Sequence, residues 1–181
     1  MALNFDAKKI TKTAIFVALS FIISILEFPL FPQAGFLKLD FSNVFILIGG
    51  FSLGPVYGVI ILFCKELLCL IKTSTYVGQI ANFLMGLSYI LLPTLIYKYK
   101  KGIKVVIMSL ILATFLQVGV SLVVNRFINF PLYLPGMPKE AIVNAFYSSF
   151  WFIILFNLIK GVAVAFLTIL LYKKTKKILH I

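Results

Sequence analysis

Near the C-terminal end of the chain lies an apolar run, from Phe150 to Tyr172, whose only amide and charged side chains are Asn157 and Lys160. An α-helix needs about 20 residues to cross a bilayer, and this run is longer. A surface helix of a soluble protein would instead expose polar side chains on every turn. The run therefore predicts a transmembrane helix, and it raises the question of why this helix contains a cation.

The same character extends over the whole chain. Of its 181 residues 62% are hydrophobic, and the mean hydropathy is +1.10, whereas about half of the residues of a soluble domain are apolar. We expect an all-α integral membrane protein, a single transmembrane domain over residues 1–181 with no soluble domain. No Gly-x-x-x-x-Gly-Lys-Ser/Thr loop is present, so we expect the chain not to hydrolyse ATP itself.

Other kinds of chemistry have little support in the sequence. Cys64 and Cys69 lie five residues apart in an apolar stretch, and the lone histidine is His180, so we expect neither a metal site nor thiol chemistry. The net charge of +12 would suggest nucleic acid in a soluble protein. Here the lysines gather at the ends of apolar runs, where orientation in the bilayer and anionic headgroups account for them.

Turn signals divide the chain into six predicted helices. The apolar stretch from Asp40 to Ile71 is too long for one ordinary span at about 1.5 Å per residue, and Gly49-Gly50 and Gly54-Pro55 interrupt it. Two helices with a tight turn between them are therefore expected in this stretch. The predicted spans are 10–28, 41–52, 55–71, 77–97, 103–127 and 145–172.

Positive charge supports this count. Cytoplasmic loops carry the excess of Lys and Arg, and the basic clusters are Lys8/Lys9/Lys12, Lys98/Lys100/Lys101/Lys104 and Lys173/Lys174/Lys176/Lys177. All three clusters lie on one side only if an even number of spans separates them. Six spans satisfy this condition and place both termini in the cytoplasm, with loops 29–39, 72–76 and 128–144 outside.

With this topology, the polar side chains of the predicted spans gather in the outer half of the membrane. They are Asp40, Asn43, Lys65, Glu66, Gln79, Asn82, Gln117, Asn125, Asn144 and, deeper, Asn157. A channel would have polar groups through its full depth, so the pattern predicts a cup that is open to the outside and closed below. The alternative is that these amides only bond helix to helix.

Two pairs of residues need partners. Lys65 and Glu66 are adjacent and should not share a helix face, so we expect separate partners, or side chains that extend to the outer interface. Asn157 and Lys160 are three residues apart and share a face. Lys160 would either form an ion pair with Asp40 or Glu66, or join Asn157 in presenting hydrogen bonds to a ligand with carbonyls and ring nitrogens.

Small residues four apart suggest close helix contacts. Ala14 and Ala18 have this spacing in the first span, and Gly161 and Ala165 have it in the last. Faces with this spacing let another helix approach closely. They serve either internal packing or docking to a separate membrane subunit.

Several of these motifs occur together in a known family. The stretch GFLKLDFSNVFILIGGFSLGPVYGVIILFCKELLCLI and the later YVGQIANFLMGLSY resemble the riboflavin-specific S component of energy-coupling factor (ECF) transporters. Asn125 before the outer loop, Asn157-x-x-Lys160 and Ala14-x-x-x-Ala18 fit this resemblance. The chain departs from it at Asn43 and Gln79, where the family often has Asp and Glu.

The resemblance implies a six-helix subunit of a prokaryotic plasma membrane that captures riboflavin and is not an enzyme. It implies a transmembrane T component and two cytoplasmic ABC-type ATPases as partners, and a subunit that topples in the membrane to deliver its ligand. Riboflavin would be the transported ligand, with no resident cofactor. The expected ligand-binding residues are Leu39, Asp40, Gln79, Asn82, Asn125, Asn157 and Lys160, and the expected docking residues are Ala14 and Ala18.

Three alternatives remain open on the sequence. The chain could be an S component for another vitamin or related compound, a small membrane enzyme, or a subunit without a small ligand. An enzyme acting on lipid would need clustered carboxylates or a histidine near the inner interface. The sequence has no carboxylate cluster there, and His180 belongs to the C-terminal tail.

Overall fold

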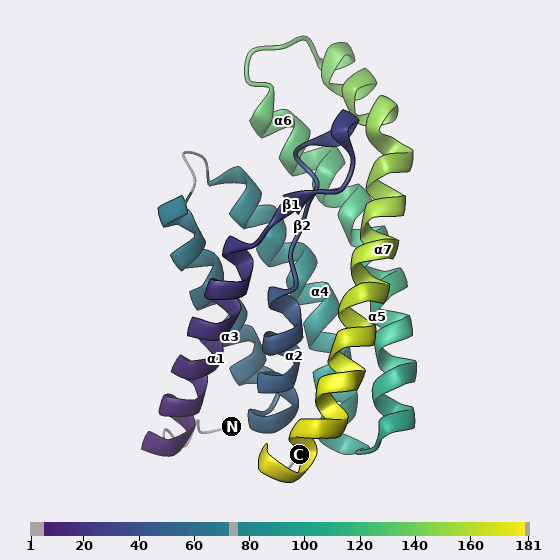
Figure 1. The fold of residues 1–181 in the computed structure, drawn as a ribbon. Helices are drawn as coiled ribbons and strands as arrows, with labels where there is room; N and C mark the ends of the chain where they lie inside the picture. The colour runs from purple at the N-terminus through teal and green to yellow at the C-terminus, as the bar shows by residue number, and fades with distance from the viewer. Residues whose placement is uncertain (1–5, 73–75, 180–181) are drawn as a thin grey trace.

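The computed structural model describes residues 6–72 and 76–179, with backbone only for 176–179. These residues form an elongated helix bundle with one small hairpin (Figure 1). The elements are α1 (Ala7–Ile25), β1 (Phe28–Pro29), η1 (Pro32–Ala34), β2 (Lys38–Leu39), α2 (Ser42–Leu53), α3 (Pro55–Cys69), η2 (Leu70–Lys72), α4 (Val77–Tyr99), α5 (Ile103–Val124), η3 (Asn125–Asn129), α6 (Phe130–Tyr133) and α7 (Lys139–Leu179). The predicted all-α fold is confirmed.

The predicted division of 40–71 into two helices is also confirmed, but Gly49-Gly50 does not interrupt the stretch, because both glycines lie inside α2. The break falls at Gly54, whose φ of 106° is accessible to glycine but strained for other residues. Pro55 follows as the first residue of α3, where its missing N–H leaves no helical bond unmade. The first helix begins and ends three residues earlier than predicted, at Ala7 and Ile25.

The boundaries at the outer end of the last two long helices were predicted wrongly. The sequence indicated a helix ending at Phe127 and a loop over 128–144. Instead, α5 continues through a π-helical turn, η3, into α6, so that the helix is continuous from Ile103 to Tyr133. Pro131 does not break it, because it stands in the first turn of α6. The last helix, α7, likewise begins at Lys139 rather than Ala145.

The loop predicted over 29–39 has structure of its own. Strands β1 and β2 pair in antiparallel register, Phe28 with Leu39 and Pro29 with Lys38. The connection folds over α7, where Phe31 and Phe152 have ring centroids 5.4 Å apart. Leu39 lies in a buried apolar cluster with residues of α7. The hairpin is thereby held against the outer part of the bundle.

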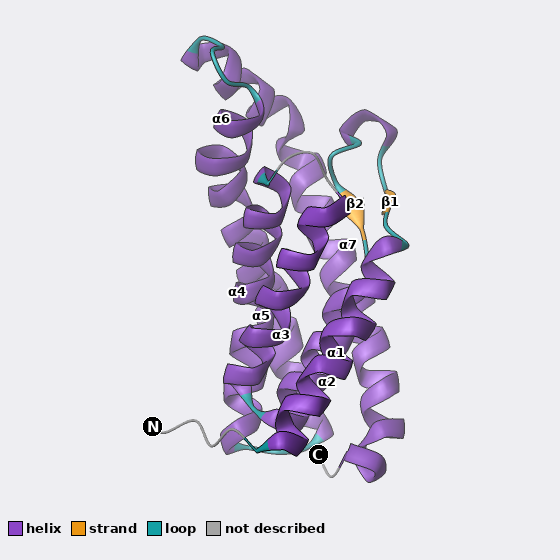
Figure 2. Ribbon diagram, turned by 90° about the vertical axis from the view of Figure 1, so that its left-hand side faces the viewer, coloured by secondary structure: helices purple, strands orange, loops and turns teal. Residues whose placement is uncertain are grey.

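The start of the first helix and the end of the last lie at the same end of the bundle, as expected if the chain crosses the membrane an even number of times. The start of α1 and the end of α7 lie at one end of the bundle, and the hairpin and α6 lie at the other (Figures 1 and 2). Among the described residues, three helical segments are long and apolar enough to cross a membrane by length and composition: Val77–Tyr99, Ile103–Tyr133 and Lys139–Thr175. The count of six spans and the side of the termini stay predictions. Residues 73–75 of the predicted loop 72–76, and His180, lie outside the described residues.

The end of the bundle that holds both helix termini is closed by packing. Gly50 lets α2, α3 and α4 come together, because a Cβ there would stand 2.5 Å from Thr94 Cγ2 and 3.5 Å from Gly58 Cα. Below it, the hydroxyls of Tyr97 and Tyr172 lie 2.8 Å apart and both side chains are buried. We call this end the inner end and the hairpin end the outer end.

Candidate functional site

A cavity of about 400 Å³ opens at the outer end, and its place follows from the length of α2. With 12 residues α2 is about 18 Å long, short against a bilayer core of about 30 Å. It therefore begins well below the outer ends of α5 and α7 (Figure 1). Small-molecule sites usually measure about 300–1,000 Å³, so the cavity is large enough for a ligand.

Aromatic and polar side chains share the wall of this outer cavity. Phe36, Tyr133 and Phe156 provide rings from the hairpin, α6 and α7. The amides are Gln79, Asn82, Asn125, Asn129 and Asn157. Ring faces and amide groups together suit a flat ligand with polar edges. The outer cavity thus combines a broad apolar contact with directional hydrogen bonds.

Next to the outer cavity, Lys160 meets Asp40. Lys160 Nζ donates to Asp40 Oδ2 at 2.8 Å, and the two side chains are 10% and 8% exposed. Asp40 Oδ1 accepts from the backbone N–H of Ser42 at 2.9 Å and from the Ser42 hydroxyl. The carboxylate therefore ties the start of α2 to the middle of α7. Of the two partners that the sequence left open, Asp40 is the one observed.

A second buried ion pair corrects the prediction for Lys65 and Glu66. Lys65 Nζ donates to Glu66 Oε1 at 2.8 Å, and the side chains are 4% and 7% exposed. The expectation of separate partners, or of extension to the outer interface, is wrong. Adjacent Cα–Cβ bonds diverge on a helix, but these two side chains are long enough to turn toward each other. Pairing lowers the high cost of two isolated charges in this setting.

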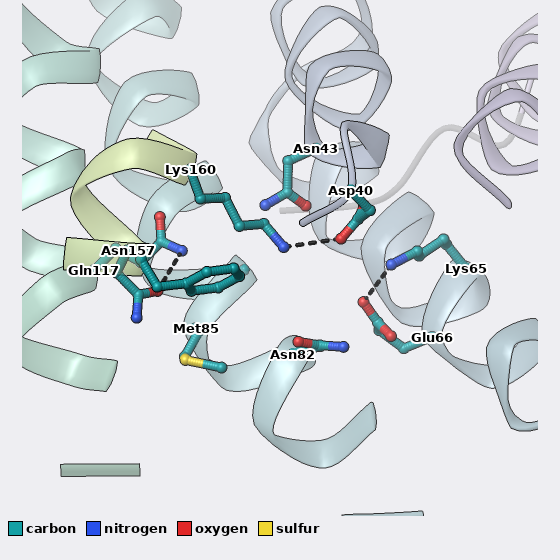
Figure 3. Close-up of a pocket in the computed structure, with 11 residues that line it drawn as sticks. Asp40, Asn43, Lys65, Glu66, Asn82, Met85, Gln117, Asn157 and Lys160 are labelled. Carbon is teal, nitrogen blue, oxygen red and sulfur yellow. Dashed lines mark hydrogen bonds and ion pairs between the residues drawn. The ribbon is translucent and has the colours of Figure 1, made fainter. Parts of the chain in front are cut away.

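The two ion pairs surround a small inner pocket of about 20 Å³ (Figure 3). This volume is about the room of one water molecule. Asn82, Met85, Phe156 and Asn157 line both this inner pocket and the outer cavity. The ionic groups therefore form the base of the same site.

Hydrogen bonds between amide side chains fix several of the other polar groups at the site. Gln117 Nε2 donates to Asn157 Oδ1 at 3.3 Å, and Asn157 Nδ2 donates to the Ile153 carbonyl at 2.9 Å. In the π-helical turn, Asn129 Nδ2 donates to Asn125 Oδ1 at 3.0 Å. Single π-turns inside α-helices are frequent at functional sites. Here the turn brings a second amide beside Asn125.

Three buried acceptor atoms at the site lack a hydrogen-bond donor. They are Glu66 Oε2 and Gln117 Oε1 at the inner pocket and Asn129 Oδ1 at the outer cavity. A buried polar atom left unpaired costs about 1–3 kcal/mol. Each of these acceptors could take a hydrogen bond from a bound molecule or from water.

Comparison with known proteins shows the family to which the chain belongs. The family model for the ECF transporter substrate-specific component matches residues 8–172. The chain belongs to this family. The predicted resemblance is therefore confirmed, and the subunit is called an S component below.

Two curated relatives and one solved structure extend along nearly the whole S component. The riboflavin transporter RibU of Staphylococcus aureus is 35% identical over 92% of this chain and 89% of its own length. The riboflavin transporter FmnP of Bacillus subtilis is 28% identical over 93% and 92%. A structure described as the S component of a bacterial ECF transporter superposes with a TM-score of 0.80 at 37% identity, covering 96% of this chain and 98% of the other.

These relatives are membrane transporters of bacteria, so the predictions of a membrane protein and of a protein that is not an enzyme are confirmed. The alternative of a small membrane enzyme is excluded.

Six of the seven predicted ligand residues line the outer cavity or the inner pocket. Gln79 and Asn125 line the outer cavity, Asp40 and Lys160 the inner pocket, and Asn82 and Asn157 line both. Leu39 lines neither and packs in the apolar cluster under the hairpin. Asn144, which was placed with the outer polar groups, is exposed.

Sequence reasoning missed Asn129 because the helix was ended at Phe127. Its signal was present, since Asn125 and Asn129 are four residues apart and share a face if the helix continues. It also missed the charged rim of the outer cavity. There Glu27 lies 3.2 Å from Lys38 Nζ and 3.9 Å from Lys72 Nζ.

The two pairs of small residues have different surroundings. Ala14 and Ala18 are exposed on the outside of α1, so internal packing does not explain them. Gly161 is buried between helices: a Cβ there would stand 2.6 Å from Thr114 Cγ2 on α5. The spacing in α7 thus serves internal packing.

Proposed function

We propose that this S component binds riboflavin in the outer cavity and passes it inward as the capture subunit of an ECF-type vitamin importer. The observation that carries the proposal is the cavity itself: it measures about 400 Å³, aromatic and amide side chains line it, and it adjoins the inner pocket with the two ion pairs. Relatives that carry the name riboflavin transporter, at 28–35% identity over most of the chain, support this choice of ligand.

The unpaired acceptors support a ligand that is rich in donors. Riboflavin has an N–H flanked by two carbonyls on its ring and four hydroxyls on its ribityl chain. Glu66 Oε2, Gln117 Oε1 and Asn129 Oδ1 are acceptors without donors. A ligand hydroxyl or ring N–H that reaches one of them relieves a cost of about 1–3 kcal/mol and is thereby selected over an apolar competitor.

Lys160 has donors left for the ring. An ammonium group has three N–H bonds, and one of them is directed to Asp40. We assign the others, with the amides of Asn157 and Asn125, to the carbonyls and nitrogens of the ring edge. The aromatic groups Phe36, Tyr133 and Phe156 would cover the ring faces. The hairpin that precedes Asp40 would close the mouth, with Leu39 holding it in place rather than contacting the ligand.

Energy for inward movement must come from other subunits. We propose that a transmembrane T component docks on the exposed face with Ala14 and Ala18, and that two cytoplasmic ABC-type ATPases drive the cycle. Exposure of both alanines on α1 supports this face as the contact. Riboflavin is then cargo, and we propose no resident cofactor.

An S component specific for another vitamin is the remaining alternative. It is tested by equilibrium binding of the purified subunit to riboflavin and, separately, to thiamine, biotin, folate and pantothenate. We expect saturable binding of riboflavin at one site per chain and none of the others at the same concentration. Tighter binding of another vitamin would refute the proposed ligand while leaving the family unchanged.

A further inference from the structure

A second cavity, larger than the outer cavity, lies at the inner end of the bundle. Its volume is about 650 Å³. It lies where the start of α1, the α2–α3 turn and the end of α4 meet. Lys9, Lys98 and Lys101 line it, together with Ser52 and apolar side chains such as Val56. We call it the inner basic cavity.

The charged side chains that line the inner basic cavity are all lysines. None of the carboxylate side chains lines the inner basic cavity, and none of the ion pairs among the described residues involves Lys9, Lys98 or Lys101. Lys9 is half-buried, so the surrounding residues limit how far its side chain can extend into water. Three ammonium groups around one hollow give a positive potential that a neutralising anion would lower.

Further groups on the wall suit an oxygen-rich anion. The Ser52 hydroxyl is a buried polar atom with no hydrogen-bond partner. Helix α3 begins at the cavity without a side-chain cap, so its positive end faces the hollow. Apolar neighbours complete the wall, among them Phe51, Leu53 and the exposed Val56. A phosphate group beside acyl chains matches both the polar and the apolar part.

From this geometry we propose that the inner basic cavity binds the headgroup of an anionic phospholipid of the cytoplasmic leaflet. Basic hollows between transmembrane helices on the cytoplasmic side have the right depth and charge for such headgroups. The phosphate would contact Lys9, Lys98 and Lys101, the Ser52 hydroxyl would donate to a headgroup oxygen, and the acyl chains would run along the lipid-facing surface. This site is separate from the outer cavity, because the two cavities share no lining residue.

The chain offers a matched control for the lysines. Lys8, Lys100 and Lys104 lie at the same inner end, are exposed, and do not line the cavity. The triple variant Lys9→Gln/Lys98→Gln/Lys101→Gln and the triple variant Lys8→Gln/Lys100→Gln/Lys104→Gln have the same net charge. They differ only in whether the missing charges surround the hollow. Thermal unfolding of each would show that it remains folded.

The test is native mass spectrometry of the detergent-solubilised S component with added phosphatidylglycerol or phosphatidylcholine. We expect the wild type to retain one phosphatidylglycerol in preference to phosphatidylcholine. The cavity triple variant should bind it about 10- to 100-fold more weakly, because each lysine near a headgroup contributes several-fold. The control triple variant should stay within about threefold of the wild type, as expected for unspecific surface charge.

A second variant tests the hydroxyl. Ser52→Ala, which keeps all three lysines, should weaken retention by several-fold, as expected for loss of one hydrogen bond. Equal weakening in both triple variants would overturn the proposal, as would wild type that does not prefer phosphatidylglycerol. Binding of inorganic phosphate without phosphatidylglycerol would overturn it as well. In those cases the lysines would remain available to an acidic segment of a partner subunit.

Discussion

Lys160 lies in an apolar helix because a carboxylate from a distant part of the chain meets it there. The three-residue spacing from Asn157 was enough to predict a shared face toward the site. Sequence could not choose between Asp40 and Glu66 as the partner, because the choice depends on how α2 and α7 pack. The same limit explains the error at Lys65 and Glu66, since a pairing rule based on helix faces ignores the reach of two long side chains.

A first prediction separates the structural and ligand roles of Lys160. Lys160→Met should lower the free energy of unfolding by about 3–5 kcal/mol, because Asp40 is left buried without its cation. It should also weaken riboflavin binding about 10- to 100-fold, since a charged hydrogen bond is worth about 1.5–3 kcal/mol. Thermal unfolding and ligand titration on the same protein would measure both.

The double variant Asp40→Asn/Lys160→Met is the control for this prediction. Removing the carboxylate charge should restore most of the stability, because no unpaired charge remains buried. Riboflavin affinity should stay low. If affinity returned together with stability, Lys160 would act on the ligand only through the fold, and its proposed contact with the ring would be wrong.

At the scale of the elements, turn residues predicted the helix boundaries well where a glycine or proline requires a special backbone. Gly54-Pro55 marked the α2–α3 turn to the residue. The outer end of α5 escaped prediction because Pro131 is tolerated in the first turn of a new helical segment. A π-turn has no composition signal of its own. The short α2 creates the room for the outer cavity. This consequence could not be predicted from the length of α2 alone, because it depends on how far the neighbouring helices extend beyond its start.

A second prediction concerns the exposed face of α1. Ala14→Trp or Ala18→Trp should abolish riboflavin uptake by cells, because a bulky ring blocks close approach of a T component. Riboflavin binding to the isolated subunit should be unchanged, since both alanines point away from the bundle. Phe115→Trp, at an exposed and already bulky position on α5, should leave uptake intact. Loss of binding together with uptake would indicate internal packing instead.

A third prediction concerns the other small-residue face. Gly161→Leu should destabilise the isolated subunit by about 1–3 kcal/mol, because its side chain meets Thr114 on α5. The additional variant Thr114→Ser removes the methyl group nearest to the new Cβ and should recover part of the loss. Thermal unfolding measures both. A fully stable Gly161→Leu would contradict the close contact between α5 and α7.

At the scale of the whole molecule, the sequence predicted an all-α membrane fold with an outward cup and a closed inner end. Long apolar runs were enough to predict the membrane fold, because the bilayer acts on every residue alike. The sidedness that the basic clusters indicate stays a prediction. The outer hairpin, the pairing of charges and the two-part cavity depend on contacts between distant segments. None of these leaves a local pattern in one sequence.

A fourth prediction tests the side of each end. In a background with Cys64 and Cys69 replaced by serine, a cysteine introduced by Lys139→Cys should react with a membrane-impermeant maleimide in intact cells. One introduced by Lys100→Cys should react only after the cells are opened. The reason is that Lys100 belongs to a basic cluster, which the positive-inside rule assigns to the cytoplasm. Labelling of Lys100→Cys in intact cells would refute the six-span topology.

Occupation of the outer cavity by riboflavin can be tested by titrating a variant whose side chain fills this cavity. Asn82 lines both the outer cavity and the inner pocket, whereas Leu95 is exposed on the same helix. Wild type and Leu95→Trp should bind riboflavin saturably, one per chain. Asn82→Trp, folded by thermal unfolding, should bind at least about 100-fold more weakly, because the indole takes the ligand's space. Full affinity in Asn82→Trp, or no saturable binding by the wild type, would show that riboflavin does not bind in the outer cavity.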